Sequence, residues 1–331
     1  ALTMLSPANV GYASTCNSIG QTFGAFIANQ GFISLSDATW CHRMIGTPVG
    51  ETMATLSSFM SLAGYVFIVV TVAIALLKTE APLPREEEPT GIKETYKQIG
   101  GLLHLAPVQK LLVILLTVKM SFAPADSVAI FEMQEHGMPK ADWATFSPVT
   151  MVIGLVLPAL IANWVSRDPL HALKLAIPLK LCTTALFWVV VNAVPAAYAS
   201  EDGPGYDFFA GLLVVMVLHT AFDVLVFSAF MSFFNKISDP IIGGTYMTFL
   251  NSASNMGHKW TNTLVVWCTG RASNFTSTYI GGDMDGYTII TIVCVSFGFF
   301  WMYAVFPMLR QLESVRREDW WVSTTTNKRD R

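Results

Sequence analysis

Between two long apolar runs the chain reads Ser238-Asp239-Pro240-Ile241-Ile242-Gly243-Gly244-Thr245-Tyr246-Met247-Thr248-Phe249-Leu250-Asn251. Asp239-Pro240 cannot continue a helix smoothly, because proline pushes the preceding residue out of the helical region. Gly243 and Gly244 let the backbone turn, or let another helix approach closely. Polar side chains then continue into the next apolar run, which neither a soluble loop nor a lipid-facing helix explains. The stretch therefore predicts the start of a helix that lines an interior space.

Composition places the chain in a lipid bilayer. Of its 331 residues, 53% are hydrophobic and only 13% are charged, whereas soluble domains carry roughly 25% charged residues. The net charge is -3, and no segment of the sequence resembles a basic face that would bind nucleic acid, so no nucleic-acid partner is expected. Apolar runs of about 17–25 residues predict eight membrane-spanning helices, at residues 10–35, 55–77, 108–131, 144–166, 181–200, 206–234, 244–269 and 286–309.

Basic residues alternate between the loops and predict an orientation. Segments 78–110, 167–180 (with Lys174 and Lys180), 235–243 and 310–331 are rich in Lys and Arg. The alternate loops carry only Arg43, Lys140 and Arg271. By the positive-inside rule the first set is cytosolic.

The opposite, non-cytosolic face carries a sequon and two cysteines. Asn274-Phe275-Thr276 is an N-glycosylation sequon, so Asn274 is a predicted glycosylation site. Cys41 and Cys268 lie on the same face and could form a disulfide. No Cys/His cluster has metal-site spacing, so we expect neither a metal nor a cofactor.

A polar segment at 78–107 divides the chain. It contains three prolines around Arg85-Glu86-Glu87-Glu88, followed by a short amphipathic pattern suited to the membrane surface. Six helices form one half of a major facilitator transporter. The sequence therefore predicts an all-α polytopic membrane protein of the major facilitator fold, a fragment with eight of twelve transmembrane helices. Its predicted parts are residues 1–77, the last two helices of an N-terminal half; 78–107, a cytosolic linker; 108–310, a six-helix C-terminal half; and 311–331, a cytosolic tail.

Two long motifs resemble the acetyl-coenzyme A transporter family. One extends the opening stretch upstream through Asn235-Lys236-Ile237, and the other is Asn9-Val10-Gly11-Tyr12-Ala13-Ser14-Thr15-Cys16-Asn17-Ser18-Ile19-Gly20-Gln21-Thr22. Shorter matches at 91–97 and 120–126 lie in order between them, whereas loop 270–286 is shorter and poorer in cysteine than the family pattern. The resemblance implies a multi-pass protein of the endoplasmic reticulum membrane that imports acetyl-CoA from the cytosol into the lumen.

A carrier for acetyl-CoA needs cationic groups for the phosphates and hydrogen-bond donors near the midplane. Ionisable residues inside a membrane are costly and indicate function by default. His219 and Asp223 are four residues apart, on one face of the sixth predicted span. The polar and charged residues of the first, third, sixth and seventh spans together give the predicted substrate-binding set: Asn17, Gln21, Lys119, Asp126, His219, Asp223, Asn251, Asn255 and Lys259.

Structural alternatives remain for these residues. Lys119 with Asp126, or His219 with Asp223, could be pairs that hold the bundle together, and the asparagines could join helices by hydrogen bonds. The chain could also be a permease for another polar substrate, such as a muropeptide, or a membrane-bound acyltransferase. An enzyme needs a placed catalytic base, and nothing else converges on His219 and Asp223, so we predict a carrier and not an enzyme. Exchange, proton coupling and uniport stay open, as does a homodimer.

Overall fold

The computed structural model describes residues 12–77, 92–139, 142–143, 145–199, 203–239, 242–275 and 285–322. Every regular element among these residues is a helix, which confirms the prediction of an all-α protein. Contacts divide the chain into two compact units, one of Gly20–Thr90 and one of Ala1–Ile19 with Gly91–Arg331. The two units are described separately.

The smaller unit contains one strongly apolar helix. After α1 (Tyr12–Phe26), whose second half lies in this unit, come the π-helical turn η1 (Ile27–Gly31), α2 (Phe32–Ser36), α3 (Ala38–Ile45) and α4 (Leu56–Leu77). The rings of Phe32 and Phe59 join α2 to α4 at 5.2 Å between centroids. No residue of α4 is buried within the protein. Because so large an apolar surface is unfavourable in water, α4 is suited to a lipid surround.

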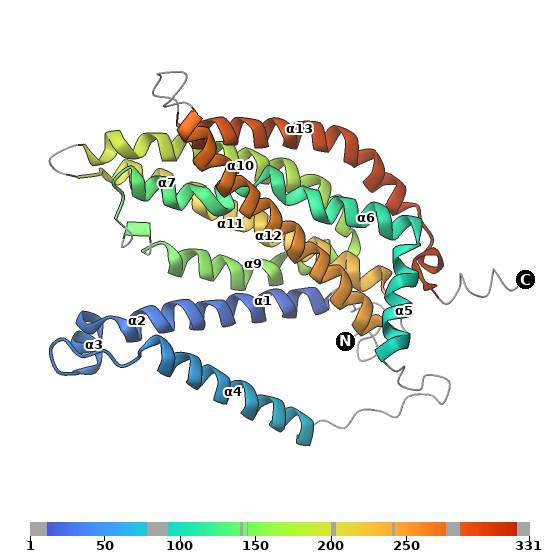
Figure 1. Ribbon diagram of the computed structural model, residues 1–331, viewed down its shortest axis with the longest axis horizontal. Helices are drawn as coiled ribbons and strands as arrows, with labels where there is room; N and C mark the ends of the chain where they lie inside the picture. Colours follow the sequence, from blue (N-terminus) through green and yellow to red (C-terminus); the bar gives the residue numbers. More distant parts are fainter. Residues whose placement is uncertain are drawn as a thin grey trace, which may run out of the picture. The chain divides into compact units, whose positions relative to one another are not determined.

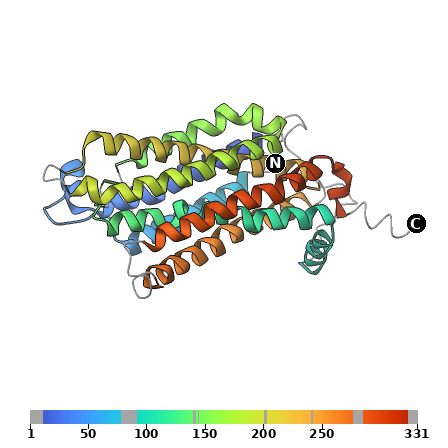
Figure 2. The same ribbon diagram turned by 90° about the horizontal axis from the view of Figure 1, so that it is seen from above.

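The larger unit is a helical bundle in which the long helices run antiparallel. Its elements are α5 (Ile92–Leu103), α6 (Ala106–Thr117), η2 (Val118–Ser121), η3 (Pro124–Val128), α7 (Ala129–Glu135), α9 (Ser147–Arg167), α10 (Pro169–Tyr198), α11 (Tyr206–Ile237), α12 (Gly243–Phe275), α13 (Gly286–Glu313) and η5 (Arg317–Trp320). In Figures 1 and 2, α13 runs alongside α6 and α10, and α12 crosses the bundle obliquely.

Five of the described helices are long and apolar enough to cross a membrane: α4, α9, α10, α11 and α13. A sixth crossing is counted if α5 and α6, which meet at a bend of 88°, form one broken span. Three of the eight predicted spans have no single helix that meets this criterion among the described residues: 10–35, 244–269 and 108–131, the last of which is met in part by the bent pair. The second of these is α12, whose 33 residues at 1.5 Å per residue are long enough to cross but unusually polar.

The predicted boundary at residue 181 is wrong, because α10 begins at Pro169. The side chain of Asp168 caps the helix by accepting a hydrogen bond from the backbone N–H of His171 at 3.0 Å. Proline is favoured in the first turn, where its missing N–H costs nothing. Residues 169–180 are therefore helix and not a cytosolic loop, and Lys180 lies in the bundle with no exposed surface.

The opening stretch of the sequence does start a helix, since α12 begins at Gly243. One turn later, the fully buried Tyr246 donates a hydrogen bond to the carbonyl oxygen of Trp320 at 3.3 Å. The Trp320 side chain packs edge-on against Phe233, with 5.6 Å between ring centroids. The described part of the predicted tail is thus packed against α11 and α12.

Basic side chains gather at one end of the larger unit. Lys110 donates to the side chain of Gln311 at 2.8 Å, Lys174 pairs with Glu313 at 2.9 Å, and Lys236 donates to the carbonyl of Arg167 at 2.8 Å. We call this the basic end. The opposite end, where α7 finishes and α13 starts, carries acidic side chains and is called the acidic end; they are Glu132, Glu135, Asp142 and Asp285.

Candidate functional site

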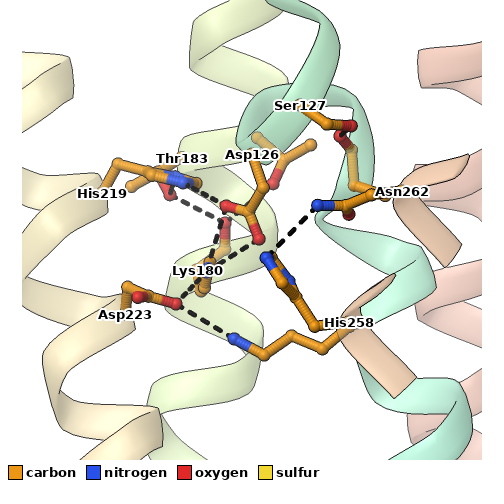
Figure 3. Close-up of polar contacts among 11 residues, drawn as sticks. Asp126, Ser127, Lys180, Thr183, His219, Asp223, His258 and Asn262 are labelled. Atoms are coloured by element: carbon orange, nitrogen blue, oxygen red, sulfur yellow. Dashed lines mark hydrogen bonds and ion pairs between the residues drawn. The ribbon is translucent and has the colours of Figure 1, made fainter. Parts of the chain in front are cut away.

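A layer of charged side chains separates two apolar clusters inside the larger unit. Along α10, Ile177 belongs to the cluster nearer the basic end and Phe187 to the cluster nearer the acidic end. Lys180 lies between them. Side chains from the third span and from α11 meet it at the same level, as Figure 3 shows for Asp126, His219 and Asp223. We call the five residues the charged layer: Lys119, Asp126, Lys180, His219 and Asp223.

Lys180 is the centre of this layer. Its ammonium group lies 3.2 Å from a carboxylate oxygen of Asp126 and forms a second ion pair with Asp223. The ring of Phe122 lies 5.0 Å from the same nitrogen, a cation–π contact. A buried ammonium is tolerated only when it is paired and hydrogen-bonded. The two carboxylates meet that requirement.

His219 joins the layer to a side chain of α10. Its Nε2 lies 2.7 Å from Asp126 Oδ1 and its Nδ1 lies 2.9 Å from the hydroxyl of Thr183. Since a carboxylate can only accept, the hydrogen in the first contact belongs to the imidazole. Phe187 packs edge-on against the ring at 5.0 Å and fixes its plane. His219 and Lys180 therefore share the Oδ1 atom of Asp126.

The layer is closed on one side and open on the other. The side chains of Lys180 and Asp126 are 0% and 11% exposed, whereas that of Asp223 is 46% exposed. Lys119 pairs with this open carboxylate at 3.2 Å and is itself 14% exposed. Lys119 and Asp223 are therefore the charges that a molecule entering the bundle would meet.

An interruption of the α-helix in the third span determines where the side chains of Lys119 and Asp126 point. Regular α-helix ends at Thr117, and the chain continues as the 3-10 helix η2 and the π-helical turn η3, which starts at Pro124. Proline lacks the N–H that an α-helix needs, and π-helical turns are frequent at functional sites. The two charges that frame the break, Lys119 and Asp126, consequently point to different partners.

Tryptophans stabilise the broken segment. The indole N–H of Trp260 donates to the carbonyl oxygen of Leu116 at 2.9 Å, and that of Trp301 donates to the hydroxyl of Thr117 at 2.7 Å. Both bonds come from neighbouring helices, α12 and α13. They satisfy polar groups at the end of α6 where the helix ladder stops.

The alternatives that pair Lys119 with Asp126, or His219 with Asp223, therefore do not describe the contacts in the structure. Neither Lys119 with Asp126 nor His219 with Asp223 forms a direct pair, and both sets share partners through Lys180 and the layer. Sequence reasoning missed Lys180 because it was counted with the cytosolic loops. The Asp168-Pro169 cap and the apolar residues on both sides of Lys180 were the signals that place it in a helix.

Helix α12 adds polar atoms beside the layer. Asn262 lies 3.3 Å from His258 through its amide nitrogen, and Figure 3 places both beside Asp126. His258 Nδ1 and Asn262 Oδ1 are buried and have no hydrogen-bond partner among the described residues. Buried polar atoms normally have partners, so this face retains unused hydrogen-bonding capacity.

The other predicted substrate-binding residues lie outside the charged layer. On α12, Asn251 is partly buried and Asn255 and Lys259 are exposed. Lys259 lines an open groove of about 620 Å³ together with Trp260 and Trp267. On α1, the side chains of Asn17 and Gln21 are exposed.

Two predictions concern the acidic end and the cysteines. Asn274 lies in the last turn of α12 with an exposed side chain, and Thr276 of its sequon is outside the described residues.

Cys41 and Cys268 are both free thiols. Cys41 Sγ lies 3.4 Å from the carbonyl oxygen of Leu35. Cys41 and Cys268 belong to different compact units, so the suggested disulfide stays a prediction.

An all-helical chain with apolar spans and charges buried between them is a multi-pass membrane protein of the transporter class. The profile of the family described as "Acetyl-coenzyme A transporter 1" matches residues 1–90, 83–193 and 179–283. The chain belongs to this family.

Two relatives are themselves uncharacterized. An uncharacterized membrane protein of Saccharomyces cerevisiae is 22% identical over 91% of this chain and 68% of its own length. An uncharacterized protein of Schizosaccharomyces pombe is 25% identical over 78% of this chain and 49% of its own length. The chain thus spans about half to two thirds of the relatives it matches. No solved structure matches it.

Proposed function

We propose that the chain acts in a carrier that moves acetyl-CoA from the cytosol into the lumen of the endoplasmic reticulum by alternating access. The observation that carries the proposal is the charged layer, in a chain that belongs to an acetyl-CoA transporter family. The basic end corresponds to the cytosolic side by the positive-inside rule. Membership of a transporter family also supports a carrier rather than an enzyme.

Substrate phosphates would enter through the open side of the layer. Lys119 is held by Asp223, and Asp223 keeps a second cation in Lys180. A phosphate can therefore bind Lys119 in place of Asp223, because the Asp223 carboxylate stays paired with Lys180. The exchange loosens the third span from α11, which is a means of linking substrate occupancy to helix movement. Asn17, Gln21, Asn251, Asn255 and Lys259 are proposed as further contacts along the path.

Uptake of labelled acetyl-CoA into proteoliposomes tests this function. We expect saturable uptake by the full-length protein, competed by unlabelled acetyl-CoA and not by a muropeptide. Competition by the muropeptide alone would favour the permease for another substrate. Release of free CoA by detergent-solubilised protein, in the absence of vesicles, would favour the acyltransferase and overturn the carrier.

Lys119→Ala and Lys259→Ala are expected to weaken uptake and to leave folding intact. A hydrogen bond to a charged group contributes about 1.5–3 kcal/mol, so loss of a phosphate contact corresponds to about a tenfold to hundredfold higher KM. Uptake kinetics and the melting temperature in detergent measure the two effects. Lys110→Ala, which removes a lysine at the basic end, is the matched control. Unchanged kinetics in both test variants would remove these lysines from the phosphate site.

Asn274→Gln tests the orientation and the compartment together. If the acidic end faces the lumen, the natural protein carries a glycan at Asn274 and endoglycosidase treatment increases its gel mobility. The variant is expected to migrate like the treated protein, because the sequon is lost. Equal mobility of all samples before and after treatment would contradict the luminal assignment of this end.

A further inference from the structure

Three side chains at the acidic end have the arrangement of metal ligands. Glu132 and His136 are four residues apart, at the end of α7, and Asp285 precedes the first turn of α13. One ligand atom from each lies within 4.8 Å of the other two. Residues four apart share a helix face, so α7 presents both of its groups to Asp285. Glu132 is only 8% exposed.

These carboxylates have no lysine or arginine partner in the part of the chain that the structure describes. Among the described residues, no ion pair includes Glu132 or Asp285. Their electrostatic neighbours include a third carboxylate, that of Glu135. Two acidic groups that approach each other away from water need either a shared proton or a bound cation. In the charged layer, lysines form ion pairs with the carboxylates. Glu132, His136 and Asp285 have no lysine among them.

Two buried oxygen atoms beside the cluster are also without partners. Asp285 Oδ2 and the hydroxyl of Tyr287 are buried and have no hydrogen-bond partner among the described residues. Tyr287 has no exposed surface, and its hydroxyl interacts electrostatically with the hydroxyl of Thr291 and with the carboxylates of Glu132 and Asp285. Because buried oxygens rarely remain unpartnered, these atoms indicate that the cluster accommodates a ligand.

The surroundings of His136 suit a metal ligand. Its Nδ1 lies 3.3 Å from the carbonyl oxygen of Val191 on α10. A hydrogen on Nδ1 is donated to that carbonyl, and the lone pair of Nε2 then stays available. Histidines that bind metals usually donate their other ring N–H in this way, which fixes the tautomer and the ring orientation.

We propose that Glu132, His136 and Asp285 bind a divalent transition-metal ion of the Zn²⁺ type, which joins α7 to α13 at the acidic end. One imidazole and two carboxylates form a mixed nitrogen and oxygen set, which suits Zn²⁺ better than the all-oxygen sites preferred by Ca²⁺ and Mg²⁺. A search for Cys and His spacing could not find this site, because two of its ligands are acidic and one of these, Asp285, is distant in sequence from the other two ligands. The proposal does not depend on the identity of the transported substrate.

Calorimetric titration of the chelator-treated, tag-free protein in detergent with ZnCl₂ tests the site. We expect saturable binding of one ion per chain and a higher melting temperature with the ion bound. Glu132→Gln and His136→Gln each remove a ligand while keeping side-chain size, so each is expected to weaken binding at least tenfold. His171→Gln removes an exposed histidine near the start of α10 and should bind like the natural protein.

Each other outcome overturns the proposal. If the natural protein shows no saturable binding and Glu132→Gln melts higher than it does, the carboxylates share a proton instead. If Zn²⁺ binds equally to both ligand variants, the ion occupies another site. If Ca²⁺ or Mg²⁺ binds tighter than Zn²⁺, the cluster is an alkaline-earth site and the assigned metal class is wrong.

Discussion

Lys180→Met is expected to abolish acetyl-CoA uptake and to lower the free energy of unfolding by about 3–5 kcal/mol, the usual cost of breaking a buried ion pair by removing one partner. The substitution leaves Asp126 and Asp223 without the ammonium group that lies against both. Asp223 retains Lys119, but Asp126 retains only His219. Melting temperature in detergent and uptake into proteoliposomes measure the two losses.

A double variant distinguishes the effect of the lost Lys180 charge from the effect of its lost packing. In Lys180→Met with Asp126→Asn, one unpaired carboxylate is also removed, so the double variant is expected to be more stable than the single variant. Lys174→Met on the same helix is the control; its partner is Glu313 and its side chain is 22% exposed. Surface ion pairs contribute about 0–1 kcal/mol. A Lys180→Met protein that melts with the natural one would contradict the central position of this lysine.

Gly257→Ala is expected to destabilise the bundle by about 1–3 kcal/mol or more, because overpacking a tight contact forces the backbone to shift. A Cβ at this position would collide with the carbonyl oxygen of Leu115 and lie 3.0 Å from its carbonyl carbon. Backbone atoms cannot move aside as a flexible side chain would. Separation of α12 from α6 would also weaken the Trp260 bond to Leu116, so we expect reduced uptake as well as a lower melting temperature.

Gly270→Ala is the matched control on the same helix, because a Cβ there meets nothing within 4 Å. Alanine is favoured over glycine inside a helix by up to about 1 kcal/mol. Gly270→Ala should therefore melt at or above the temperature of the natural protein. If both glycine variants behave alike, close approach of α12 and α6 does not limit stability.

The periodic and apolar parts of the fold could be predicted from the sequence. Helix α4 and the starts of α11, α12 and α13 lie close to their predicted positions, because long apolar runs and a Pro–Gly-Gly turn are local signals. The predicted start of α10 was wrong for a different reason. A lysine in an apolar run was assigned to a loop by its charge, although the Asp168 cap is also a local signal.

The partners within the charged layer could not be predicted from spacing. Asp126 and His219 were each identified as intramembrane ionisable residues, and the structure places both in the layer. Lys119 and Asp126 would lie two turns apart in a regular helix, whereas the 3-10 and π-helical turns change the direction of their side chains. Such irregular turns depend on tertiary contacts such as the Trp260 and Trp301 hydrogen bonds, which have no local pattern. The roles of Asn251, Asn255 and Lys259 in substrate binding remain predictions.

The packing of Trp320 has a consequence for inherited variation. Its indole fills a space beside Phe233, and its carbonyl oxygen accepts the only hydrogen that the Tyr246 hydroxyl can donate. A nonsense codon just upstream of Trp320 would therefore leave intact each described helix that is long and apolar enough to cross a membrane, and still uncover apolar surface on α11 and α12. A truncated protein of this kind would keep these helices but would expose the side chains of Phe233 and Tyr246 that Trp320 covers.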